Sequence, residues 1–211
     1  MGEGTLRLLN YQQQVLIPPY LYDNHPKSWW TLRPDFKGSI EREAKTVEYN
    51  INSQGIRAPN NLPEKSDDRE SVFIIGDSFT FGWGVNEEET FARVLDNKLK
   101  KKNLPIDVVN LGIAGYGTKQ SYERLLEYSA RLGTPDILIY MFCPNDPIDN
   151  ITGKKVVVDG VRMNANWKYK WLFVQINRAY HVSKLVAFFA DFYMQNRGNP
   201  RLNQANETQI N

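Results

Sequence analysis

The chain has few of the residues from which metal sites, disulfides and membrane spans are built. Among its 211 residues there is one cysteine, Cys143, and there are two histidines, His25 and His181. A lone cysteine can form no disulfide within the chain, and so few nitrogen and sulfur ligands argue against a zinc site. No apolar run approaches the roughly 18 residues of a membrane span, and residues 1–11 lack the apolar centre of a signal peptide. We expect no metal, no cofactor and no membrane span.

The chain also lacks a strong excess of either charge. Its formal net charge is +2, with 24% charged and 41% apolar residues. This balance argues neither for a nucleic-acid surface nor for an acidic partner, so no nucleic acid is expected to bind. The length and composition suit one α/β domain with a sizeable core.

The stretch SVFIIGDSFTFGWG (71–84) has the pattern of a strand that ends in a turn carrying a hydroxyl. Residues 72–75 are a continuous apolar run, which is typical of a strand buried on both faces of a parallel sheet. Gly76 allows a sharp turn, and Ser78 then follows at the carboxyl edge, where open α/β folds bind ligands. Apolar residues at helical spacing after Glu88 predict that a helix comes next.

The same order recurs twice along the chain. Residues 106–111 predict a strand before the glycine-rich loop GIAGYGT, and residues 136–142 predict another before Cys-Pro-Asn-Asp. Between them, SYERLLEYSARLG predicts a helix that ends at Gly133. We therefore predict an α/β fold with a doubly wound parallel sheet, in which strand 71–76 lies between the other two and the loops converge on one edge.

The first 70 residues have a different character. They contain prolines at six positions and little helical periodicity, which predicts an extended, irregular lead packed on the domain. Within the lead, alternation of Val47, Tyr49 and Ile51 predicts a short edge strand that is closed by a turn at residues 52–55.

The last third of the chain changes pattern again. KKVVVDGVRM (154–163) is two short apolar runs around Asp-Gly, which predicts a hairpin inserted at the surface. Residues 167–194 predict one or two amphipathic helices. The expected division is a lead over 1–70, an α/β domain over 71–195, and a disordered or truncated tail over 196–211.

The three strand ends carry the parts of an acyl-transfer site. Such a reaction needs a hydroxyl, a base and hydrogen-bond donors directed at the developing oxyanion. Ser78 would give the hydroxyl, and the backbone N–H groups of Ser78 and Gly115 with the side-chain amide of Asn145 would give three donors. Two other interpretations stay open: Ser78 as a hydroxyl that merely caps its loop, and the glycines of 112–117 as a phosphate-binding loop. Neither G-x-G-x-x-G nor a Walker lysine accompanies those glycines.

Three sequence blocks resemble a known family. GDSFT at 76–80, NLGIAG at 110–115 and PND at 144–146 are similar to the first three blocks of the SGNH, or GDSL-type, hydrolases. A WxLRPxFKG-like segment and INSxGxR before the first block are similar to one bacterial branch of the family. By analogy with that branch, the resemblance favours a place in the cell envelope, outside the cytoplasm.

The resemblance implies a three-layer α/β/α sandwich of the flavodoxin-like SGNH hydrolase fold. It implies that Ser78 is the nucleophile, that Gly115 and Asn145 are its oxyanion partners, and that Asp77 is a structural carboxylate that holds the loop. It also implies one or two further strands beside 136–142, and where they are missing we expect an exposed apolar edge.

The chain departs from the family pattern at two points. Cys143 stands where the third block usually has glycine, and the Asp-x-x-His block that supplies base and orienting acid is missing from the sequence. His25 follows Asp23 at the wrong spacing, and His181 lies in a predicted helix with no carboxylate three residues before it. We expect the base to belong to a C-terminal segment outside this chain, with His181 as the alternative base.

These features favour an ester hydrolase that acts through an acyl-Ser78 intermediate on a small ester or an acylated carbohydrate. Two alternatives stay open. One is a non-catalytic relative that binds an acyl or sugar ligand in the same pocket. The other is an O-acyltransferase that passes the acyl group to an envelope polysaccharide, because the same acyl-enzyme can react with a sugar hydroxyl in place of water.

Overall fold

The computed structural model describes residues 2–8, 18–42, 45–64, 66, 68–151 and 153–196. Contacts group the chain into two compact units, Ile17–Lys168 and a smaller one made of Met1–Leu16 and Tyr169–Asn211. The division expected from the sequence, at residues 70 and 195, stays a prediction. The disordered tail predicted for 196–211 lies outside the described residues except for Asn196.

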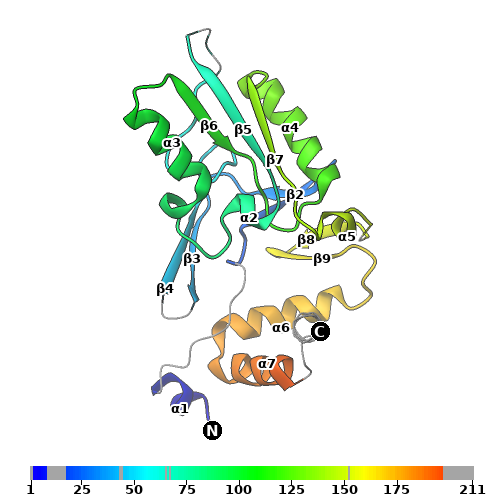
Figure 1. Ribbon diagram of the computed structural model, residues 1–211. Helices are drawn as coiled ribbons and strands as arrows, with labels where there is room; N and C mark the ends of the chain where they lie inside the picture. Colours follow the sequence, from blue (N-terminus) through cyan, green and yellow to red (C-terminus); the bar gives the residue numbers. More distant parts are fainter. Residues whose placement is uncertain are drawn as a thin grey trace, which may run out of the picture. The chain divides into compact units, whose positions relative to one another are not determined.

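A parallel sheet of three strands forms the centre of the larger unit (Figure 1). Its order is β6-β5-β7, with β5 spanning Glu70–Gly76, β6 Ile106–Asn110 and β7 Ile137–Met141. The middle place of β5 confirms the predicted strand order. The register pairs Ile74 with Asn110 and Gly76 with Met141, so the carboxyl ends of all three strands lie at one edge.

Each face of the sheet is covered by a helix, so the fold is a three-layer α/β/α arrangement, as predicted. On one face Phe73 and Ile75 pack in a buried cluster with Tyr128 of α4 (Thr118–Leu132). On the other face Val72 and Ile74 pack with Ala92 of α3 (Phe91–Lys101). Alternate residues of β5 thus face opposite layers, which is why its apolar run is continuous.

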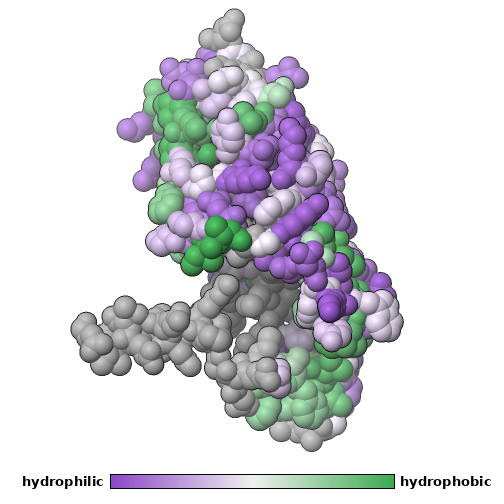
Figure 2. Space-filling view, turned by 90° about the vertical axis from the view of Figure 1, so that its right-hand side faces the viewer, coloured by the Kyte–Doolittle hydropathy of each residue, from purple (hydrophilic) through white to green (hydrophobic). Residues whose placement is uncertain are grey.

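Strand β7 is an edge strand with exposed apolar side chains. In the part of the chain that the structure describes, β7 pairs with β5 alone. Ile137 and Leu138 are each 47% exposed, and Met141 is 39% exposed. The exposed apolar edge expected on this side of the sheet is therefore confirmed. Figure 2, viewed from the right-hand side of Figure 1, shows hydrophobic surface in its upper part beside a largely hydrophilic face.

Two hairpins occupy much of the predicted irregular lead, so that prediction was wrong for these residues. Strands β1 (Tyr22–His25) and β2 (Trp29–Leu32) pair antiparallel, as do β3 (Lys37–Arg42) and β4 (Lys45–Asn50). Strand β4 confirms the predicted edge strand, and Asn52 accepts the turn N–H groups of Gln54 and Ile56, each at 3.0 Å. The sequence does not predict these hairpins, because β1 and β2 have only four residues each and β3 is mostly polar.

A third hairpin confirms the prediction for 154–163. Strands β8 (Lys155–Val158) and β9 (Val161–Asn164) are joined by Asp159 and Gly160, with φ of 51° and 75°. Positive φ at both positions is the type I′ turn that Asp-Gly favours. Its inner side chains are buried, and Asn24 of β1 makes two hydrogen bonds of 2.8 Å to the backbone of Val157. The hairpin is thus fixed to the lead rather than lying loose on the surface.

Within the described residues of the smaller unit, the helices are α1 (Glu3–Leu8), α6 (Lys170–Val182) and α7 (Lys184–Asn196). The last two confirm a pair of helices within 167–194. The Glu3 carboxylate accepts hydrogen bonds from Ser183 Oγ and from the first N–H groups of α7 at 2.8 and 3.1 Å. This capping holds the pKa of Glu3 down, to about 2. Among the helices described, none is both long and apolar enough to cross a membrane.

Candidate active site

The Gly-Asp-Ser turn follows β5 directly and leads into α2 (Ser78–Phe81). Asp77 caps this helix, since its Oδ1 accepts the N–H of Phe79 at 2.9 Å. Ser78 occupies the first helical position, is partly exposed, and its Oγ lies 3.5 Å from Asp77 Oδ2. The buried Asp77 carboxylate therefore holds the turn, and the Ser78 that follows it is partly exposed.

A buried arginine supports the loop that follows this helix. Arg57 is 3% exposed and donates to the carbonyls of Phe81, Gly82 and Val85, with distances of 2.7 to 3.2 Å. Its guanidinium also lies 4.4 Å from the ring centre of Tyr49. Burial lowers the pKa of Arg57 below its usual value. The loop is thus held through its main chain by one side chain from the lead.

The second loop packs on the serine-bearing helix. Ile113 N–H donates to the Gly76 carbonyl at 3.2 Å, and the Asn110 amide donates to the Thr80 carbonyl at 2.8 Å. Gly112 approaches so closely that a Cβ there would lie 2.6 Å from the carbonyl carbon of Thr80. These contacts bring the glycine-rich loop against the turn that carries Ser78.

Gly115 sits in a tight turn within that loop. Tyr116 N–H donates to the Ile113 carbonyl at 3.1 Å, and φ of Gly115 is +79°. This is the geometry of a type II turn, which favours glycine at its third position. The carbonyl of Ala114 accepts a hydrogen bond from Arg162 of β9.

The third loop carries Asn145 at the start of α5 (Asp146–Ile151). Asn145 is exposed, and its amide donates to Asp149 Oδ2 at 2.7 Å. An amide has two N–H groups, so one remains for another acceptor. Buried Asp146 accepts from the Tyr140 hydroxyl at 2.6 Å and from the N–H of Cys143 at 3.3 Å, which fixes the start of the loop.

Two groups around this loop have raised pKa values. Burial, and then the hydrogen bond to Asp146, raise the pKa of the Tyr140 hydroxyl. Burial is also the first cause that raises the pKa of the Cys143 thiol, with Asp77 adding to it. Both causes disfavour the thiolate form of Cys143.

His25 is not hydrogen-bonded to Ser78 in the part of the chain that the structure describes. His25 Nδ1 lies 2.7 Å from the buried Ser28 hydroxyl, and its Nε2 lies 3.3 Å from Glu127. His181 belongs to α6 of the smaller unit, and burial lowers its pKa. Among the described residues there is also no group of three or more side chains that could hold a metal ion.

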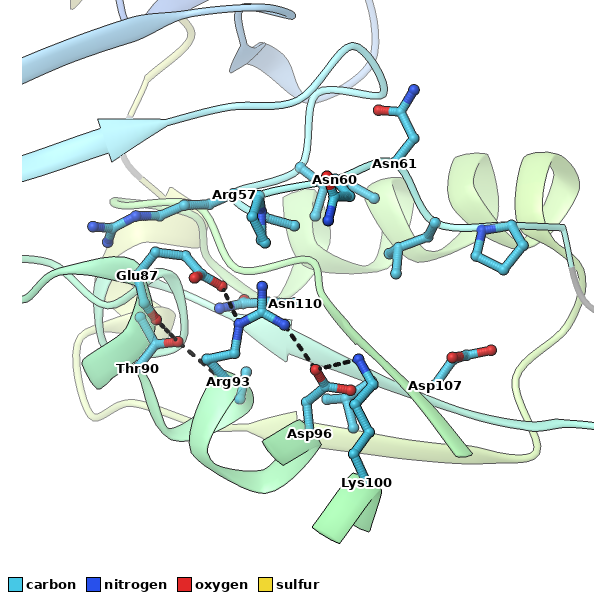
Figure 3. Close-up of a pocket in the computed structure, with 17 residues that line it drawn as sticks. Arg57, Asn60, Asn61, Glu87, Thr90, Arg93, Asp96, Lys100, Asp107 and Asn110 are labelled. Atoms are coloured by element: carbon cyan, nitrogen blue, oxygen red, sulfur yellow. Dashed lines mark hydrogen bonds and ion pairs between the residues drawn. The ribbon is translucent and has the colours of Figure 1, made fainter. Parts of the chain in front are cut away.

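A cavity of about 230 Å³ lies away from this edge, between residues 56–63 and the helix α3 (Figure 3). Four of its charged groups are paired with one another: Arg93 binds Glu87 at 2.8 Å and Asp96 at 2.7 Å, and Lys100 binds Asp96 at 2.8 Å. The three predicted site residues do not line it. We therefore keep the carboxyl edge as the candidate site.

The topology brings the loops of Ser78, Gly115 and Asn145 to one edge of the sheet, while their catalytic roles stay predictions. The arginines that hold these loops are functional residues that sequence reasoning misses. In the sequence Arg57 is only part of INSxGxR, and Arg162 is one polar residue of a hairpin. No local pattern marks an arginine that binds distant carbonyls.

One comparison with known proteins, the match to a family model, shows the family of this chain. The model of the GDSL-like Lipase/Acylhydrolase family matches residues 74–210, well over half of the chain. No match was found among curated proteins. Similar solved structures are AlinE4, an SGNH-hydrolase family esterase, and two mutants of that esterase, with identities of 17 to 19% and TM-scores of 0.34 to 0.35. Each comparison covers 42% of this chain and 47% of the other, less than half of the esterase's length.

Proposed function

Because the chain belongs to the GDSL-like lipase/acylhydrolase family, we propose that it is an ester hydrolase with Ser78 as its nucleophile. The observation that supports this most is the strand order β6-β5-β7, since it puts the three loops at one edge. Ser78 lies at a partly exposed helix start, and its neighbour Asp77 is already occupied as a cap. A reachable hydroxyl on a fixed turn suits attack on an ester.

In the proposed reaction Ser78 Oγ forms a bond to the ester carbonyl carbon and the carbonyl oxygen becomes an oxyanion. The N–H groups of Ser78 and Gly115 and the free amide N–H of Asn145 stabilise that charge. The bond to the leaving alcohol then breaks, and the alcohol leaves with the proton that the Ser78 hydroxyl gives up. Water hydrolyses the acyl-serine and restores the hydroxyl. We assign no base among the described residues, since His25 is bound to Ser28 and Glu127 and His181 belongs to the other compact unit.

The substrate is a small ester or an acylated carbohydrate. Exposed apolar side chains near the candidate site suit an acyl group, since Phe79 is 73% and Phe142 is 60% exposed. The type of acceptor decides between two outcomes. If water reaches the acyl-serine, the enzyme is a hydrolase, and if a sugar hydroxyl reaches it first, the enzyme is an O-acyltransferase.

Turnover of p-nitrophenyl acetate by the chain, by Ser78→Ala and by His181→Ala tests the proposal. We expect slow turnover that Ser78→Ala abolishes and His181→Ala leaves unchanged, because a serine without a base is a weak nucleophile. In serine enzymes the oxyanion donors and substrate binding alone retain a rate enhancement of about 10³ to 10⁴-fold over the reaction in water. Loss with both substitutions would make His181 the base. Equal background rates in all three proteins would contradict catalysis and leave a ligand-binding relative.

A further inference from the structure

We propose that Arg162 is a positioning residue that sets the direction of the Gly115 N–H, the donor assigned above to the oxyanion. This inference rests on the proposed function and adds to it a residue from the β8–β9 hairpin. Its basis is one peptide group: the carbonyl that Arg162 binds belongs to Ala114, and the N–H of that same peptide belongs to Gly115.

The turn at Ile113–Tyr116 has two possible orientations for this peptide. In a type I turn and in a type II turn the central peptide differs by about half a rotation, so its C=O and N–H exchange sides. Gly115 has φ of +79°, which selects type II. Among the described residues, no carbonyl accepts a hydrogen bond from the Gly115 N–H. The donor is thus free, and its direction depends on what holds the carbonyl.

The Arg162 guanidinium is surrounded by the Gly115 turn and by two aromatic rings. Both terminal nitrogens of its guanidinium lie within 2.9 Å of the position that a Cβ on Gly115 would take. The group lies 4.6 Å from the ring centre of Trp30 and 5.3 Å from that of Tyr22, and both rings are buried. Aromatic faces on one side and a carbonyl on the other leave the guanidinium little freedom to move.

Two effects on the donor follow. The charged hydrogen bond to the Ala114 carbonyl stabilises the type II orientation, so the Gly115 N–H points to the opposite side of the turn. It also polarises the peptide, and a polarised peptide is a stronger N–H donor. Arg162 would therefore act on the reaction through the peptide, without touching the substrate.

The peptide can be observed directly by nuclear magnetic resonance. The sequence contains Ala followed by Gly only at 114–115, so carbonyl-labelled alanine combined with nitrogen-labelled glycine gives one correlated signal. In Arg162→Met we expect the Ala114 carbonyl resonance to move upfield and the Gly115 amide resonance to move with it. Arg69→Met is the matched control, since Arg69 binds Asp107 at 2.6 and 2.8 Å at the amino ends of the strands. An unmoved signal in Arg162→Met would overturn the inference whatever the activity.

Turnover of p-nitrophenyl acetate separates positioning from substrate binding. We expect Arg162→Met to lower kcat with KM unchanged, by up to the roughly 10² to 10³-fold that loss of one oxyanion donor costs. Arg162→Lys keeps the charge and should lie between the two, and it replaces the methionine variant if that does not fold. A raised KM with unchanged kcat would refute positioning and make Arg162 a substrate contact. Turnover by the wild-type chain no faster than Ser78→Ala would count against the hydrolase, and the resonance shift would still decide the role of Arg162.

Discussion

Replacing Gly112 by alanine should separate the glycine-rich loop from the serine-bearing helix. A Cβ at this position would lie 2.6 Å from the carbonyl carbon of Thr80 and would also contact the nitrogen of Phe81, whereas ordinary contacts begin near 3.4 Å. Both partners are main-chain atoms, so no side chain can turn away to make room. The loop or the helix must shift by the difference, nearly an ångström.

The size of the effect follows from these contacts. Overpacking a filled site costs about 1 to 3 kcal/mol, and a clash with main chain belongs near the upper end. A shift would also weaken the hydrogen bonds of Asn110 to Thr80 and Gly112, each worth about 1 kcal/mol. We therefore expect Gly112→Ala to lower the free energy of unfolding by about 3 kcal/mol. For a chain of this length that corresponds to roughly 6 to 12 °C in Tm.

The assay is thermal and urea unfolding followed by circular dichroism, with Gly153→Ala as the control. A Cβ on Gly153 would have its nearest neighbour at 3.4 Å, the amide nitrogen of Asn164, which is an ordinary contact. The control should stay within about 0.5 kcal/mol of the wild type. Equal stability of the two variants would show that the loop does not pack on the helix, and the site built on that contact would have to be abandoned.

Three further substitutions test other parts of the structure. Tyr22→Phe should leave the free energy of unfolding at neutral pH equal or higher, because the buried Tyr22 hydroxyl has no hydrogen-bond partner among the described residues. Burial raises the pKa of Tyr22 from 10.0 to about 12, so the wild type should lose stability more steeply than the variant as pH rises from 10 to 12. Arg124→Met should lower the free energy of unfolding by about 2 to 5 kcal/mol in urea titrations, because Arg124 is 2% exposed and the carbonyls of Leu111 and Gly55 would lose their donor. A loss below about 1 kcal/mol would contradict that role. Glu3→Gln should weaken α7 at neutral pH, because the hydrogen bond from the Leu185 N–H to the Glu3 carboxylate is the main cause of the lowered pKa of Glu3. Measured by circular dichroism, the difference in helicity between variant and wild type should disappear as pH falls from 4.5 to about 2.

The sheet could be predicted from the sequence because its signals are local. An apolar run such as 72–75 followed by glycine marks a buried strand, and right-handed connections then fix the order of the strands. The Asp-Gly hairpin was equally readable, since only a few residue types tolerate positive φ at both turn positions. The type of each element and the convergence of the loops follow from rules of this kind.

What could not be predicted depends on contacts between distant residues. Strand β1 has four mostly polar residues, and its contacts with the β8–β9 hairpin come from far along the chain: Asn24 binds Val157, and Arg162 lies over the Tyr22 ring. The bond from Arg162 to Ala114 joins positions 48 residues apart in the chain. Propensity and periodicity act over a few residues, so they carry no information about such a pair.

The arginines around the candidate site bind main-chain carbonyls, so the side chains of the residues they hold take no part in the contact. Arg57 holds the loop after Ser78 through the carbonyls of Phe81, Gly82 and Val85, and Arg162 holds Ala114 in the same way. A carbonyl is offered by every amino acid, so the identity of the side chain at a held position has little influence on the bond. Phe81 and Ala114 are themselves buried, so the side chains free to vary are the exposed ones beside them, such as Phe79 at 73% exposure. The surface around Ser78 could therefore be adapted to a new acyl group or sugar by substitution at such exposed positions, without rebuilding the loops that present the hydroxyl.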